Sequence, residues 1–179
     1  MTDKPSEPEF SRPFDVGTLG SDTVALSHEA GPAERAALAR RFGLKDLPAL
    51  KADFRIRRGP GAEIEVEGRL AARATQTCVV SLEPVEAVID EAFALVYAPP
   101  SDERGPEADD IDPDAADPPE PILAGKIDLG EAAAEQLSLS LDPYPRKPGA
   151  AFDAEAMGVA DGGRPSPFAA LAVLKPKDK

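Results

Sequence analysis

The chain has 179 residues, a length that fits one domain or one domain with unstructured additions. Its net charge of −13 disfavours general binding to nucleic acids or to anionic membranes. A single cysteine excludes an intramolecular disulfide and fits a reducing compartment, so we expect a cytoplasmic protein.

The first twenty residues are polar and proline-containing, which predicts a partly disordered N-terminal arm over residues 1–20. They contain no apolar stretch typical of a secretory signal. No apolar run in the sequence approaches the ~18 residues of a membrane helix. Residues 21–179 are expected to form a single domain.

A helix is predicted at residues 32–42. Pro32 suits a first helical turn, because its missing N–H costs little there. Alanine, leucine, arginine and glutamate fill the interior, and all are good helix formers. Gly43 supplies a stop. His28 precedes this helix and is predicted to be a surface side chain.

Apolar and charged residues alternate at residues 50–57, 64–79 and 87–97, and this period of two predicts three strands with one apolar face each. Turns at residues 58–61 and 81–84 separate the strands. The first strand is basic on its charged side and the second is acidic. If the two are antiparallel, cross-strand ion pairs will neutralise part of the basic charge.

Residues 99–121 combine prolines with acids, and low hydrophobicity with high charge predicts a disordered acidic loop. A helix is then predicted at residues 128–142, where an acidic cap precedes an apolar stripe at helical spacing. Residues 146–163 are rich in glycine and alanine and predict a mobile segment. A short final helix is predicted from residue 166.

Together these elements predict a single α+β domain. Its centre is a mostly antiparallel sheet of about four strands, with a barrel-like closure as one possible form, and two or three helices pack on it. The acidic insertion is predicted to lie outside the packed core.

The residues that could carry chemistry are few. Cys78 stands three positions before Ser81, and one thiol with one hydroxyl forms neither a zinc site nor a redox pair. The acidic run lacks the ligand spacing of a calcium loop. A hydrolase would need carboxylates such as Glu83 and Glu91 to converge in a pocket. We therefore predict a structural thiol, no metal, no cofactor and no enzymatic activity.

Several motifs follow one another in a fixed order along the chain. They are CVVSLEPV at 78–85, IDLGE at 127–131, QLSLSLDPYP at 136–145 and RPSPFAAL at 164–171. Over roughly residues 45–175 this order resembles the YceD-like family of large ribosomal RNA subunit accumulation proteins, in a bacterial, cysteine-poor subgroup. Many members carry a second cysteine where Ser81 stands, and a later cysteine pair is absent here, so no metal role is carried over.

The resemblance implies a non-catalytic factor that supports 23S ribosomal RNA accumulation and large-subunit biogenesis. The possible partners are 23S rRNA, a large-subunit precursor or ribosomal proteins, with no membrane partner. Residues 34–58 hold eight bases and three acids, a locally basic region. The candidate contact residues are Arg35, Arg40, Arg41, Lys51, Arg55, Arg57, Arg58, Arg69, Arg73, Arg146 and Lys147. The alternative is an interaction adaptor that binds ribosomal or other basic proteins without touching RNA.

Overall fold

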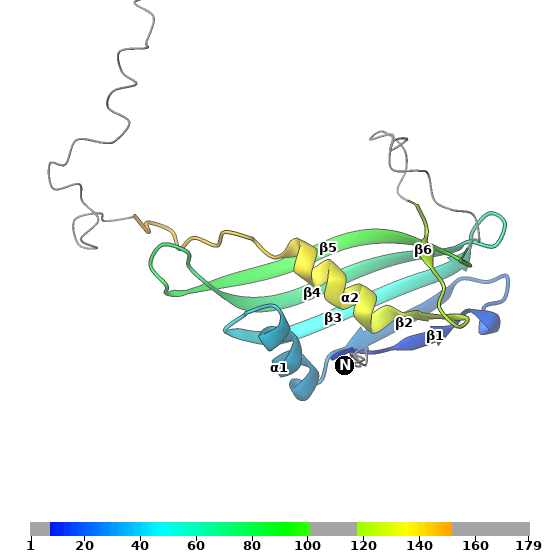
Figure 1. Cartoon of the computed structure of the whole chain (residues 1–179), viewed down its shortest axis with the longest axis horizontal. Coiled ribbons are helices and arrows are strands. Elements are labelled where there is room, and N and C mark those ends of the chain that lie inside the picture. Colours follow the sequence, from blue (N-terminus) through cyan, green and yellow to red (C-terminus); the bar gives the residue numbers. More distant parts are fainter. Residues whose placement is uncertain (1–7, 101–117, 152–179) are drawn as a thin grey trace, which may run out of the picture.

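The computed structural model describes residues 8–100 and 118–151. Two α-helices, one short 3-10 helix and seven strands make up this part of the chain (Figure 1). In chain order they are β1 (Pro13–Asp15), η1 (Val16–Thr18), β2 (Val24–Glu29), α1 (Pro32–Arg41), β3 (Asp46–Arg58), β4 (Ile64–Thr77), β5 (Pro84–Ala98), β6 (Glu120–Pro121), β7 (Lys126–Asp128) and α2 (Leu129–Ser140).

The main sheet has the strand order β2-β3-β4-β5-β6, antiparallel except for the short parallel pairing of β5 with β6. A second sheet pairs β1 with β7. The α+β class and the antiparallel sheet are therefore confirmed. The sheet has five strands where about four were expected, and neither β2 nor the short β6 was located from the sequence. The sheet does not close into a barrel, because β2 and β6 are not neighbours.

Both helices begin where their sequences predict. The carboxylate of Glu34 accepts the Gly31 N–H at 2.7 Å before α1. Asp128 accepts the N–H groups of Gly130 and Glu131 at 3.0 and 3.2 Å, which caps α2. Gly43 follows α1 with a φ of +64°, a backbone conformation that glycine adopts without steric cost.

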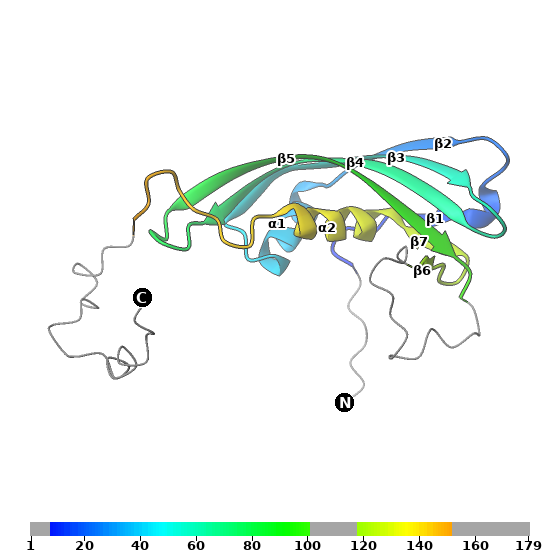
Figure 2. The same cartoon turned by 90° about the horizontal axis from the view of Figure 1, so that it is seen from above.

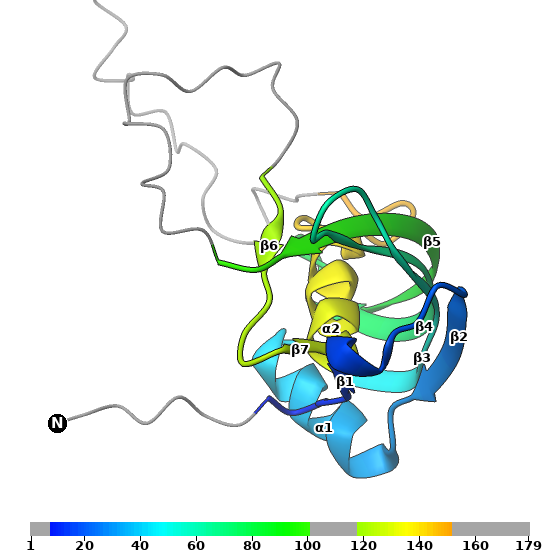
Figure 3. The same cartoon turned by 90° about the vertical axis from the view of Figure 1, so that its right-hand side faces the viewer.

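The core lies between the sheet and the two helices. The strands curve, and both helices lie on the concave side (Figures 2 and 3). Phe54 and Leu70 face inward from the sheet, and Leu38 of α1 and Leu137 of α2 pack in the same buried cluster. Burying such a side chain stabilises the fold by roughly 1.5–3 kcal/mol.

The part of the expected N-terminal arm that the structure describes is packed. Phe10 is fully buried, and the backbone N–H of Arg12 donates to Asp128 at 2.7 Å. The neighbouring N–H of Leu129 donates back to the Arg12 carbonyl at 3.1 Å. Residues 8–20 thus form a strap over the start of α2.

Other expected segments lie partly outside the described residues. The acidic loop does so at residues 101–117, and the mobile segment at 152–163. The final helix predicted from residue 166 lies wholly outside them. Within the described ranges, neither α-helix has the length and apolar character needed to cross a membrane.

Candidate functional site

Five of the predicted contact residues share the convex face of the sheet, opposite the helices. Their strand register places them at the outward positions of β3 and β4, alternating with the buried residues. These five are Lys51, Arg55, Arg57, Arg69 and Arg73. The structure therefore gathers part of the basic region on one surface.

Acids on the same face pair with most of these bases. Arg57 forms an ion pair with Glu65, the residue directly opposite on β4. Arg69 forms two hydrogen bonds with Asp90 of β5, at 2.7 and 2.8 Å, and these hold the pKa of that carboxyl below its ordinary value. The cross-strand pairing predicted from the alternating charges is confirmed for β3 and β4 (Arg57 with Glu65).

A third pair joins two outward residues of β3. The ammonium of Lys51 lies 3.0 Å from the carboxylate of Asp53. A hydrogen bond from Ser27 and the contact with Lys51 both lower the pKa of Asp53. Against the five outward bases, the register sets seven acids: Glu29, Asp46, Asp53, Glu65, Glu67, Glu86 and Asp90. The convex face is a mosaic of both charges and carries no cationic excess.

The six remaining candidates lie elsewhere. Arg41 of α1 pairs with Glu9 and Glu131, and these contacts raise its pKa. Lys147 follows α2 and pairs with Glu83 at 2.9 Å. The side chains of two others donate to backbone carbonyls, and the side chains of the last two form no hydrogen bond or ion pair with another described residue. The carbonyl donors are Arg35 and Arg58, and the other two are Arg40 and Arg146.

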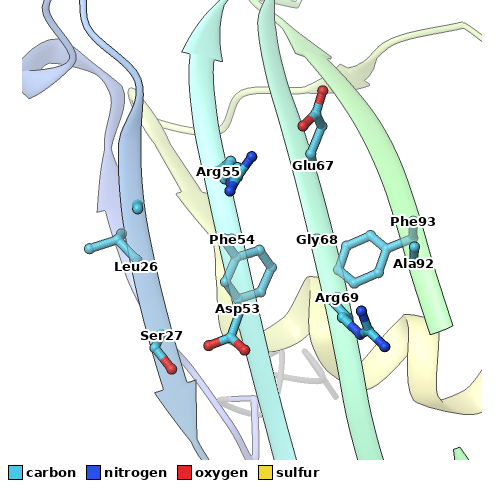
Figure 4. Close-up of a pocket in the computed structure, with 11 residues that line it drawn as sticks. Leu26, Ser27, Asp53, Phe54, Arg55, Glu67, Gly68, Arg69, Ala92 and Phe93 are labelled. Carbon is cyan, nitrogen blue, oxygen red and sulfur yellow. The ribbon is translucent and has the colours of Figure 1, made fainter. Parts of the chain in front are cut away.

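An open depression of about 670 Å³ lies over β2, β3, β4 and β5 (Figure 4). Gly68 is one of its lining residues, and a Cβ at this position would overlap the Phe93 ring, so the glycine lets that ring lie against β4. That ring packs edge-on against Phe54, with 6.0 Å between the ring centroids. Charged outward residues surround the depression, among them Arg55 and Glu67, which face each other in the register.

Cys78 occupies the turn between β4 and β5 and is 0% exposed. Its Sγ accepts the backbone N–H groups of Lys147 at 3.4 Å and of Ser81 at 3.3 Å. These hydrogen bonds lower the pKa of the thiol to about 6, and the one from Lys147 has the largest effect. The backbone N–H of Val79 also donates to the Pro145 carbonyl at 2.9 Å. Cys78 thus helps to join the segment after α2 to this turn, in keeping with the predicted structural role.

The groups that a hydrolytic site would need lie apart. Glu83 is bound to Lys147 at the turn, and Glu91 lies eight residues further along the chain, roughly 25 Å in an extended strand. His28 is an inward residue of β2 beside Phe54. Burial is the main cause that lowers its pKa, and the positive charge of Arg12 lowers it further. In residues 8–100 and 118–151, no three histidine, cysteine or acidic side chains gather as metal ligands.

Comparison with protein families gives one match that covers more than half of the chain. The model described as "Large ribosomal RNA subunit accumulation protein YceD" matches residues 66–175. The matched range includes β4 from Val66 onward, β5, α2 and the Cys78 turn. This confirms the resemblance drawn from the sequence motifs. No curated protein and no solved structure matches the chain.

Proposed function

The chain belongs to the YceD family, and from this premise we propose that it is a non-catalytic cytoplasmic factor supporting 23S rRNA accumulation and large-subunit biogenesis. The observation that carries the proposal is the family match over residues 66–175. The family description refers to large-subunit ribosomal RNA and to no reaction. A protein of this kind acts by offering surfaces to RNA or to proteins during assembly.

Direct RNA contact would depend on bases that the protein does not neutralise itself. Phosphate contacts come mainly from lysine and arginine and weaken as salt rises. On the convex face, Arg55 and Arg73 have no ion pair with another described residue. Lys51 pairs with Asp53, and Arg57 pairs with both Glu65 and Glu67. Arg55 and Arg73 are therefore the better candidates on this face.

A second candidate function is an adaptor that binds a basic protein of the large subunit. The charges of the convex face favour it, since a surface with five bases and seven acids has little net attraction for phosphates. In this reading the link to 23S rRNA passes through a protein partner.

Crosslinking followed by recovery of the tagged full chain from lysate, with and without nuclease, tests the proposal. Recovery of large-subunit precursors is expected whether the chain contacts RNA directly or through a protein partner, and absence of this recovery would contradict the proposal. If RNA is contacted directly, nuclease removes the associated material, and an Arg55→Gln/Arg73→Gln variant recovers less RNA. A Lys51→Gln/Arg57→Gln variant is the matched control, with the same change of charge on the same face. Recovery of one protein that resists nuclease supports the adaptor.

A further inference from the structure

The outer edge of β5 is open along most of its length. β5 has 15 residues, of which only Tyr97 and Ala98 pair with β6. No other described strand pairs with this edge along residues 84–96. Figure 1 shows β5 at the margin of the sheet, with β6 beside one end only. Such an edge presents a row of unpaired backbone donors and acceptors.

β5 has few of the features that usually block pairing at an edge. Its register with β4 runs without a shift from Pro84 to Tyr97, so no bulge interrupts it. Proline occurs only at its first position, and lysine is absent. Natural edge strands are commonly protected by bulges, prolines, lysines or inward-pointing charges. Apart from the proline at its first position, β5 has only the last of these, in Glu91. The other edge strand, β2, is much shorter, with six residues.

The side chains of β5 favour a particular kind of partner. The strand contains three acids and no base: Glu86, Asp90 and Glu91. Asp90 is bound to Arg69, while Glu91 is exposed although its register places it on the inward set, opposite Leu70. Val88 and Val96, which are 79% and 38% exposed, provide apolar contact along the outward side.

We propose that the open edge of β5 binds an extended, basic segment of a partner protein, which adds to the sheet as a further strand. Backbone hydrogen bonds would hold the segment, with its apolar residues beside Val88 and Val96 on the outward side and its lysines or arginines beside Glu91 on the other side. A polyanion such as RNA meets only acids on this strand. A second copy of the chain would place three further acids in the same ladder without a base to balance them. The inference rests on β5 itself and goes beyond the proposed function.

A synthetic peptide provides the test. A labelled peptide of about ten residues that alternates lysine and valine matches a long strand. Its binding to the full chain is measured by fluorescence anisotropy, and backbone hydrogen exchange identifies the site. Two control peptides replace every lysine by glutamate or every valine by proline, which has no N–H to donate. The lysine–valine peptide is expected to bind and to slow exchange at residues 84–96, and neither control should do so.

Substitutions in the protein locate the effect. Glu91→Lys should weaken peptide binding by about fivefold to tenfold, because it replaces an attractive cross-strand pair by a repulsive one. Glu29→Lys makes the same change on β2, the opposite edge, and should leave the affinity unchanged. Equal loss in both variants, or equal binding of the proline peptide, would indicate nonspecific electrostatic attraction and overturn the proposal.

Hydrogen exchange without peptide separates the other possible occupants. Protection of residues 84–96 that rises with protein concentration would identify a second copy. Protection that is present at every concentration would identify a segment of the same chain. Protection induced by an RNA homopolymer would identify nucleic acid. Each result contradicts the proposal and leaves the role in 23S rRNA accumulation to be tested separately.

Discussion

The two faces of the five-stranded sheet have the same alternating pattern but opposite environments. On the concave face, Phe54 and Leu70 are buried beneath the helices. On the convex face, the intervening residues of the same strands, such as Arg55 and Arg69, are exposed. The first face stabilises the fold through apolar burial, and the second carries charges that largely balance one another. Substitutions on the two faces should therefore have separable effects.

The largest difference is expected between a core leucine and an exposed arginine of the same strand. Leu70→Ala should lower the free energy of unfolding by about 2–5 kcal/mol, because it leaves a cavity in the buried cluster between the sheet and the helices. Arg73→Ala, three residues further along β4, should change it by no more than about 0.5 kcal/mol. Denaturant unfolding measures both. Similar losses in the two variants would contradict the division between the faces.

A second prediction concerns the packing that closes the concave side. A Cβ at Gly130 would overlap the backbone of Phe10 and Arg12, so Gly130→Ala must displace either the N-terminal strap or α2. We expect a loss of about 1–3 kcal/mol and faster proteolysis within residues 8–20. Gly68→Ala is the control, since its Cβ would meet the ring of Phe93, a side chain that can rotate. If Gly130→Ala lowered the free energy of unfolding less than Gly68→Ala does, the N-terminal strap would be only loosely held.

The buried but polar turn at Cys78 gives a pH-dependent prediction. The hydrogen bonds from Lys147 and Ser81 lower the thiol pKa from 9.0 to about 6. The folded chain then binds fewer protons than the unfolded chain between these values. The stabilisation by the thiolate should be complete above pH 9 and be lost as the pH falls through about 6.

Unfolding of the native chain and of a Cys78→Ser variant across this pH range provides the measurement. The difference in free energy of unfolding between the two proteins should become smaller as the pH falls. Thiolate absorbance of the native chain should titrate near pH 6, the pKa of the folded thiol. A difference that stays constant would show that the thiol has an ordinary pKa.

The smallest effect is expected for an ion pair on the convex face. Arg57→Ala removes the contact with Glu65 and should cost at most about 1 kcal/mol, because exposed pairs gain little in water. Raising the salt concentration should reduce the difference between the variant and the native chain. A cost comparable to that of Leu70→Ala would show that the convex face contributes to folding far more than its exposure indicates.

The sequence predicted the local elements well, because alternation and capping are local signals. The period of two located β3, β4 and β5, and Asp128 located the start of α2. β2 was missed because the lone histidine, at an inward position, interrupted its apolar alternation. The packing of Phe10 and the open edge of β5 depend on contacts between distant segments, which no local pattern records.

The candidate site shows the same limit. The eleven bases could be identified from the sequence, and the possibility of cross-strand neutralisation could be anticipated. The ion pair between Arg69 and Asp90 could not be predicted, because these two residues are diagonal neighbours on β4 and β5 and the pair depends on the register of the strands. The carbonyl contacts of Arg58 likewise depend on where Leu19 lies after folding.

The ratio of 23S to 16S rRNA in cells depleted of this protein tests its proposed role most directly. We predict that depletion lowers the ratio and that expression of the native chain restores it. An unchanged ratio after complete depletion would contradict the proposed role in large-subunit RNA accumulation.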